Sequence, residues 1–334
     1  MHPEDIVRFE FTNDHEAGNV RTIWLRKGWA LLLLFLLAVG CITVKVNLFE
    51  EEQPLEEKVV SGHGRDKILL MDLSGLIIET PRKGVLSLLL GKTVGPSRVK
   101  EELEKARKDK RIKAVVVRIN SPGGTVSAAD MIYHEIIRFK EERQVPVVAC
   151  CMSLAASGGY YVAQAANEIL AHPTTLTGSI GVVAMKFNLK GLMNKVGVQQ
   201  DTVKSGPWKD FWSPFRPATE AEKHMMQTII DDFYQRFVLV VEQGRHLSRE
   251  EVQKVADGRI FTAAQARDLH LVDRLGYLDD GVQTAKDRAG LTQAKVVVYH
   301  RPDSYRPTVY SLGPELFGDL GPQFLYLWGA EMGL

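Results

Sequence analysis

Three short glycine-rich segments place hydroxyl side chains next to backbone amides that no bulky side chain covers. They are NSPGG (120–124), AASGGYY (155–161) and TGSIG (177–181), and they occur where strand-like patterns give way to helix-like ones. Adjacent glycines permit positive φ angles and let N–H groups point outward. A serine beside such amides is a candidate nucleophile for acyl transfer, because the amides stabilise the oxyanion that forms when the serine attacks a carbonyl.

Ser157 is the candidate nucleophile among these hydroxyls. It follows the apolar run VPVVACC (145–151) and precedes a short helix predicted over 160–166. The dipole and the free N–H groups at the start of a helix favour developing negative charge. Serine is also a preferred N-cap of helices, so this segment alone is typical of a structural turn as well.

Four short, continuous apolar runs predict the strands that must carry these segments. They are KILLMDLSGLI (67–77), KAVVVRI (113–119), VPVVACC and EILAH (168–172). Amphipathic helical patterns lie between them, and a longer helix is predicted over 218–241. Strands that alternate with helices indicate an α/β domain with buried, largely parallel strands. We expect this domain over 67–300, followed by an aromatic C-terminal tail over 301–334.

The uncharged run GWALLLLFLLAVGCITV (28–44) is long enough to cross a bilayer as a helix. Basic residues precede the run and three glutamates follow it, so the positive-inside rule puts the N-terminus in the cytoplasm. We expect a cytoplasmic segment over 1–27, a transmembrane signal anchor over 28–48 that contacts membrane lipid, and a linker over 49–66. A cleaved signal peptide and a lipoprotein site at LAVGC (37–41) are the alternatives.

The charge balance argues against a nucleic-acid partner. Forty-two Lys plus Arg against forty-one Asp plus Glu leave a net charge of +1, so no overall field attracts a polyanion. The three cysteines form no CxxC or His/Cys cluster with zinc-ligand spacing. We therefore expect no metal site and no other cofactor.

The ordered set NSPGG, AASGGYY, TGSIGV and KSGPWKD resembles the signal peptide peptidase A family of bacterial membrane serine peptidases, which use a Ser/Lys dyad. The segment DGRIFTAAQARDLHLVDRLG (257–276) is similar to that family's C-terminal pattern, and the matches cover roughly residues 67–290. The resemblance implies a Clp/crotonase-type fold, a superhelix of ββα units. It also implies a homo-oligomer in which one site takes its serine and its lysine from neighbouring subunits.

By this resemblance Ser157 is the nucleophile, and Lys209, the second lysine of KSG-x-x-K, is the general base. The serine proton can pass only to an uncharged amine, because an ammonium group has no lone pair. The amides of Gly158 and Gly124 are the expected oxyanion hole, with the glycine before Gly124 as the alternative donor. Ser179 is the candidate that orients the lysine amine, and its alternative is an ordinary turn serine.

Together with the anchor, the resemblance implies a membrane-anchored serine endopeptidase of the bacterial cytoplasmic membrane, with its catalytic domain on the outer side. The expected substrates are remnants of cleaved signal peptides and other hydrophobic peptides, which the small and aromatic residues around Ser157 would accept. One alternative is a non-catalytic membrane scaffold that binds peptides on the same fold. Another is an acyl-CoA enzyme of the crotonase type, against which the anchor and the KSG-x-x-K motif argue.

Overall fold

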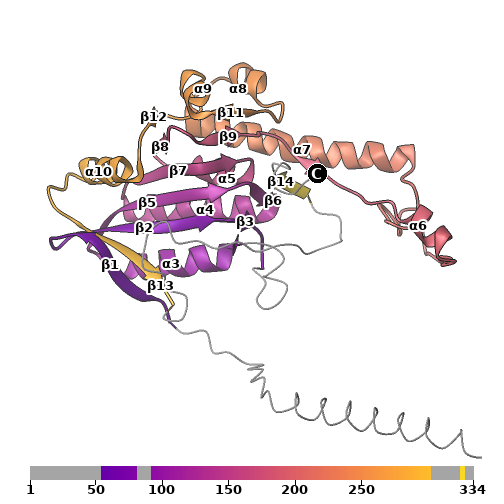
Figure 1. Ribbon diagram of the computed structural model, residues 1–334, viewed down its shortest axis with the longest axis horizontal. Helices are drawn as coiled ribbons and strands as arrows, with labels where there is room; N and C mark the ends of the chain where they lie inside the picture. The colour runs from indigo at the N-terminus through magenta and orange to yellow at the C-terminus, as the bar shows by residue number, and fades with distance from the viewer. Residues whose placement is uncertain (1–53, 81–91, 302–323, 328–334) are drawn as a thin grey trace, which may run out of the picture. The chain divides into compact units, whose positions relative to one another are not determined.

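The computed structural model describes residues 54–80, 92–301 and 324–327. A nine-stranded, mostly parallel sheet forms its centre (Figure 1). From edge to edge the main strands are β1 (Glu56–Gly62), β13 (Lys295–His300), β2 (Lys67–Ser74), β5 (Ile112–Ser121), β7 (Val147–Ala156), β8 (Glu168–Ala171) and β12 (Arg274–Leu275). All neighbouring pairs from β13 to β12 are parallel, which confirms the predicted α/β class.

The two faces of this sheet bury separate sets of side chains, because successive residues of a strand point to opposite sides. Leu69 and Val115 belong to one apolar cluster, whereas their neighbours Ile68 and Val116 belong to the other. The first face packs against α3 (Pro96–Lys108), α4 (Val126–Arg143) and α5 (Gly158–Ala163), and the second against α10 (Leu278–Arg288). Burial on both faces explains why the strands read as continuous apolar runs.

Shorter elements surround the C-terminal end of β7. β9 (Leu176–Gly178) pairs with β7, and β11 (Ile260–Thr262) pairs with β9. A smaller sheet has the order β10 (Val183–Ala184), β14 (Phe324–Leu327), β6 (Gly123–Thr125), β3 (Leu76–Ile77) and β4 (Thr93–Val94). The remaining helices described are α6 (Lys190–Lys195), α7 (Glu220–Arg245), α8 (Arg249–Val255) and α9 (Ala263–Asp268). The predicted C-terminal tail thus contributes strand β14.

Strand β1 lies inside the segment predicted as a linker, and the prediction for 49–66 is wrong there. Residues 56–62 pair antiparallel with β13, although all but one of them are exposed. An exposed edge strand has no apolar alternation, so its sequence carries no strand signal. The predicted membrane anchor, 28–48, lies outside the described residues. Within residues 54–80, 92–301 and 324–327, no helix is both long and apolar enough to span a bilayer.

An ion pair ties α7 to the main sheet. Arg245 donates two hydrogen bonds to Asp273, at 2.7 and 2.9 Å, and Asp273 also accepts the N–H of Ile169 in β8 at 2.7 Å. Burial works to raise the pKa of Asp273, but the hydrogen bonds from Arg245 and Ile169 outweigh it and hold that pKa below its usual value. The carboxylate form of Asp273 therefore stabilises the folded state.

We expect Asp273→Asn to lower the free energy of unfolding at pH 7 by about 1–2 kcal/mol, because Arg245 loses its counter-charge while Asp273 is itself partly exposed. A carboxylate with a depressed folded pKa stabilises the protein above its unfolded pKa of about 4, and this stabilisation is lost as the pH falls through the folded pKa. Urea denaturation at pH 7 and pH 3 should show the difference between wild type and variant shrinking in acid. A difference independent of pH would contradict this assignment.

Candidate active site

Ser157 occupies a sharp turn between β7 and α5. Its φ of 52° and ψ of −118° lie in a region that non-glycine residues rarely adopt. The Ser157 N–H donates to the Gly178 carbonyl at 2.8 Å, and the Ser157 carbonyl accepts the Tyr161 N–H at 2.8 Å. Gly158 is the first residue of α5, where amides have no acceptor within the helix. A strained strand-to-helix turn of this kind presents the nucleophile in many hydrolases.

The Ser157 hydroxyl is buried without a partner. The residue is 1% exposed, and its Oγ has no hydrogen-bond partner among the residues that the structure describes. Buried hydroxyls are nearly always hydrogen-bonded, since removing one from water without compensation is unfavourable. A functional site is the usual reason for keeping both this unpaired group and a strained backbone at one residue.

Ser179 follows the strand beside Ser157. In the parallel pair of β7 and β9, Ala156 lies opposite Gly178, so the next residues, Ser157 and Ser179, leave the sheet side by side. Ser179 has a φ of 50°, and its N–H donates to the Arg259 carbonyl at 2.8 Å. The structure thus brings together the backbones of the predicted nucleophile, Ser157, and the predicted lysine-orienting residue, Ser179.

The glycine-rich turn after β5 leads into the short strand β6. The Gly123 N–H donates to the Oγ of Ser121 at 3.1 Å, so this amide has a partner within its own turn. A Cβ on Gly124 would lie 1.8 Å from the carbonyl oxygen of Ile77, so only glycine fits there. β6 pairs with β3 on one edge and with β14 on the other, where Tyr326 is opposite Gly124.

Lys209 lies on a projecting segment between α6 and α7, which Figure 1 shows away from the main sheet. Its side chain is exposed. The first lysine of the same motif, Lys204, pairs with Asp210 at 2.6 Å, and Arg216 holds that carboxylate from the other side at 2.9 Å. Because the Ser157 Oγ has no hydrogen-bond partner, Lys209 does not reach it within one copy of the chain.

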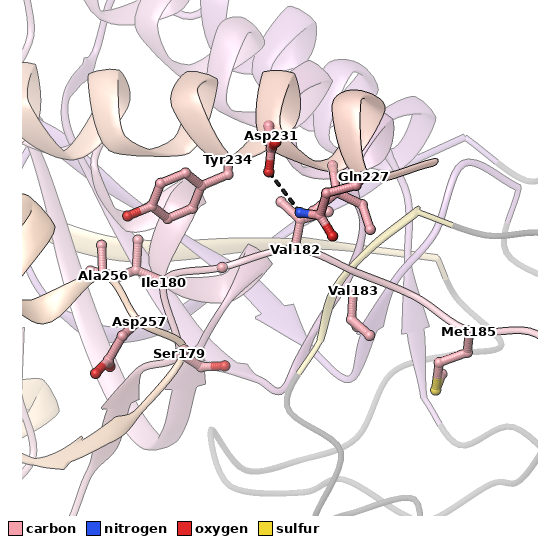
Figure 2. Close-up of a pocket in the computed structure, with 13 residues that line it drawn as sticks. Ser179, Ile180, Val182, Val183, Met185, Gln227, Asp231, Tyr234, Ala256 and Asp257 are labelled. Carbon is pink, nitrogen blue, oxygen red and sulfur yellow. Dashed lines mark hydrogen bonds between the residues drawn. The ribbon is translucent and has the colours of Figure 1, made fainter. Parts of the chain in front are cut away.

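A cavity of about 590 Å³ lies beside Ser179 (Figure 2). Its mostly apolar wall is formed by Ile180, Val183, Met185, Ile230 and Tyr234. Gln227 donates to Asp231 at 2.7 Å on the α7 side of this cavity. Hydrogen bonds from Arg259 lower the pKa of Asp257 to about 2, so that residue adds a negative charge to the lining at neutral pH. Ser157 is not among the lining residues.

Two groups near these segments were not singled out in the sequence. Ser121 is fully buried, and its hydroxyl takes part in the glycine-rich turn. The Lys186 amine is also buried, lies 5.4 Å from the centre of the Trp212 ring, and has no hydrogen-bond acceptor among the described residues. Burial lowers the pKa of Lys186. A lysine ending the apolar run GVVAM is the only sequence signal for this environment.

Comparison with known proteins gives two family matches. The model of peptidase family S49 matches residues 139–292, and that of Clp protease matches residues 96–176. The two matches together contain β5, β6, β7, α5 and the projecting segment. A Clp protease-like α/β fold with a mixed sheet is therefore confirmed for the domain.

Individual relatives align with most of the chain. A Synechocystis protein named as a protease is 42% identical over 232 residues, which cover 70% of this chain and 78% of the relative. A signal peptide peptidase SppA protein of Enterococcus faecium is 35% identical over 244 residues, covering 73% and 70%. The chloroplastic serine protease SPPA of Arabidopsis thaliana is 34% identical over 260 residues, covering 76% of this chain but 38% of the relative.

The alignments to the Synechocystis and Enterococcus proteins extend over more than two thirds of each relative, so the similarity includes far more than a shared glycine-rich turn. These three relatives are named as proteases or peptidases, and one of them is named as a serine protease. The strained, buried serine at the end of β7 agrees with that chemistry. The chain belongs to peptidase family S49 and is a serine-type peptidase.

Proposed function

We propose that this chain is a membrane-anchored endopeptidase in which Ser157 is the nucleophile and Lys209 the general base. Its substrates are remnants of signal peptides and other hydrophobic peptides at the outer side of the bacterial cytoplasmic membrane, where residues 28–48 hold the domain. The observation that carries the catalytic part is the Ser157 hydroxyl, buried without a partner on a strained turn. No other hydroxyl of the three glycine-rich segments combines these two properties.

The reaction begins when the uncharged Lys209 amine takes the proton of the Ser157 hydroxyl as Oγ attacks the substrate carbonyl carbon. The resulting oxyanion is stabilised by the Gly124 and Gly158 amides. When the tetrahedral intermediate collapses, the peptide C–N bond breaks and the Lys209 ammonium returns the proton to the leaving amine. A water molecule then hydrolyses the acyl-enzyme with Lys209 again acting as base, and the serine is regenerated.

The hydrogen bonds around the glycine-rich turn support Gly124 rather than Gly123 as the second oxyanion donor. The Gly123 N–H is already donated to Ser121. On the side of β3, the Leu76 N–H donates to the Lys92 carbonyl at 2.8 Å and the Ile78 N–H donates to the Val94 carbonyl at 3.0 Å, so both amides face the β4 side. Because amide directions alternate along a strand, Ile77 of β3 pairs with the neighbours of Gly124, and the Gly124 amide faces the opposite edge of β6. β14 pairs along that edge in the structure, and a substrate strand would take its place there.

A second copy of the chain would supply the lysine. Within one copy Lys209 does not reach Ser157, and α6 and the projecting segment after it carry exposed apolar side chains, among them Leu192, Val196 and Trp208. Exposed apolar groups concentrated on one segment are typical of a surface that another protein covers. We therefore propose a homo-oligomer in which this segment brings Lys209 to the Ser157 turn of the neighbouring copy, with Ser179 orienting the amine.

Two features support extended, apolar peptides as substrates. β14 pairs along the edge of β6 opposite β3 and also with β10, so this edge accepts a strand in extended conformation. The cavity beside Ser179 is lined largely by aliphatic side chains, which suits an apolar substrate residue. One relative is named as a signal peptide peptidase, which is consistent with such substrates.

A fluorophosphonate probe tests the proposed nucleophile against a non-catalytic scaffold. We expect the probe to label the full-length protein in detergent at Ser157 alone, as located by mass spectrometry of the tryptic peptide, because only an activated hydroxyl displaces the leaving group at phosphorus. Ser157→Ala should abolish labelling, whereas Ser153→Ala, which removes an exposed hydroxyl of the same strand, should not. Labelling that persists in Ser157→Ala would remove Ser157 from the mechanism.

A further inference from the structure

Ser121 is the last residue of β5 and has no exposed surface. Its hydroxyl donates to the Gly75 carbonyl at 2.7 Å and accepts the Gly123 N–H at 3.1 Å. Through these two bonds the Ser121 hydroxyl links Gly75, in the β2–β3 connection, to Gly123, in the glycine-rich turn.

The same residue also touches the nucleophile turn. Ser121 lies opposite Ala155 in the pairing of β5 with β7, two residues before Ser157. A Cβ on Gly159 would lie 2.9 Å from the Ser121 carbonyl oxygen and 3.3 Å from its Cβ, so α5 rests directly on this residue. Ser121 therefore contacts both segments whose amides are assigned to the oxyanion hole.

Gly123 adopts an unusual backbone conformation. This residue has a φ of 108°, which only glycine adopts readily, and glycine has no side chain of its own to hold such an angle. The bond from its N–H to Ser121 fixes the preceding peptide group, and with it the direction in which the Gly124 amide leaves the turn. An oxyanion donor accelerates the reaction only when it is aimed in advance at the developing charge.

We propose that Ser121 is a positioning residue for the oxyanion hole: its hydroxyl holds the Gly123 peptide so that the Gly124 amide faces the carbonyl oxygen attacked by Ser157. This inference rests on the proposed function of Ser157 and Gly124. Ser121 touches neither the substrate nor the reacting atoms. It acts through the backbone of the two glycines that follow it.

Two peptide inhibitors that differ only in their terminal group, an aldehyde or an alcohol, test this role. A peptide ending in leucinal forms a hemiacetal with Ser157 whose oxygen occupies the oxyanion hole, whereas the matching peptide ending in leucinol forms no such bond. We expect Ser121→Ala to weaken leucinal binding about tenfold or more and to lower kcat by a similar factor. KM and leucinol binding should stay nearly unchanged, because the Gly124 amide interacts with the oxyanion of the adduct and the transition state but not with leucinol or the unreacted substrate. An unchanged leucinal-to-leucinol ratio would overturn the proposal.

Ser74→Ala is the matched control. Ser74 is also a buried serine at the end of a strand of the same sheet, and its hydroxyl donates to Asp72 at 2.7 Å rather than to the glycine-rich turn. We expect this variant to keep the wild-type inhibitor ratio even where its melting temperature falls. An equal drop in the ratio for both serine variants would mean that general loosening of the sheet, not positioning, lowers the ratio.

Two further variants keep the test decisive where Ser121→Ala does not fold. Ser121→Thr keeps the hydroxyl but adds a methyl group near Gly159, so we expect lower stability with a preserved inhibitor ratio. Ser121→Cys keeps the size but offers only a weak donor and acceptor, so the ratio should fall. The opposite order would refute a role for the hydroxyl. If Ser121→Ala leaves the leucinal-to-leucinol ratio unchanged while Ser157→Ala is inactive, only the positioning role of Ser121 is rejected. If Ser157→Ala is active, the proposed function itself is rejected.

Discussion

Ser157→Ala is expected to lower kcat/KM for a leucine-rich fluorogenic peptide by a factor of at least about 10⁴, to the detection limit of the assay. Without Oγ no acyl-enzyme forms, and the remaining amides act only on an uncatalysed attack by water. The exposed hydroxyl of Ser153 in the same strand provides the control, since Ser153→Ala should retain wild-type turnover. Turnover within tenfold of wild type in purified Ser157→Ala would exclude this serine as nucleophile.

The same variant makes a second, opposite prediction for stability. In the wild type the Ser157 hydroxyl is buried and has no hydrogen-bond partner in the described part of the chain, which costs about 1–3 kcal/mol. Alanine removes that group while leaving the positive φ in place, so Ser157→Ala should melt at the same temperature as the wild type or above it. An inactive variant that is not destabilised is the signature of a residue kept for chemistry rather than for packing. A clear loss of stability would contradict that interpretation.

The sequence predicts β2, β5, β7 and β8, four adjacent strands of the nine-stranded sheet, because these strands are buried on both faces. The runs that became β2, β5 and β7 are continuous and apolar, and their parallel order follows from the helices between them. The exposed strand β1 shows the limit of this reasoning. β1 is held by backbone pairing with β13 and its side chains are almost all exposed, so its sequence lacks the apolar pattern that predicts a strand.

The candidate site likewise contains residues that the sequence predicts and residues that it does not. Glycine next to serine at the end of an apolar run is a local signal, and it locates the turn that the structure shows to be strained at Ser157. The partner hydroxyl of Ser121 carries no such signal, because a serine before Pro-Gly-Gly is typical of any turn. Only the fold brings Gly75 and Gly123 to opposite sides of that hydroxyl.

The spacing of motifs along the chain does not predict where Lys209 lies relative to Ser157 in the folded protein. Its motif identifies it as the base by resemblance, yet the folded single chain leaves it exposed on a segment remote from β7. A general base needs an uncharged amine, and a desolvated environment favours the uncharged form of an amine. Docking of the projecting segment on a neighbouring copy would supply both the short distance to Ser157 and the dry surroundings.

Lys209→Ala is accordingly expected to be as inactive as Ser157→Ala when each is purified alone. Lys195→Ala is the matched control, since it removes another lysine of the same projecting region, at the end of α6. Lys186→Ala tests the competing base, the buried amine beside Trp212, and should keep activity. A result with Lys186→Ala inactive and Lys209→Ala active would transfer the role of base to Lys186.

Mixing the two inactive variants then decides whether a site is shared between copies. In a closed ring each site combines the serine of one copy with the lysine of the next, so an equal random mixture of Ser157→Ala and Lys209→Ala chains contains complete sites at about one position in four. Co-expression of the two differently tagged variants, followed by purification through both tags, should therefore restore about a quarter of wild-type turnover. Each complete site would use the Ser157 of a Lys209→Ala chain and the Lys209 of a Ser157→Ala chain.

Two controls make this result specific to shared sites. Replacing the Lys209→Ala partner by the double variant Ser157→Ala/Lys209→Ala removes every intact serine, so that mixture should remain inactive. If Ser157 and Lys209 instead act within one copy, no mixture of single variants contains a complete site, and turnover stays at the background of the separate variants. Restored activity therefore requires that Lys209 cross to the neighbouring chain, which is the contact that the isolated fold lacks and that its exposed apolar segment is suited to make.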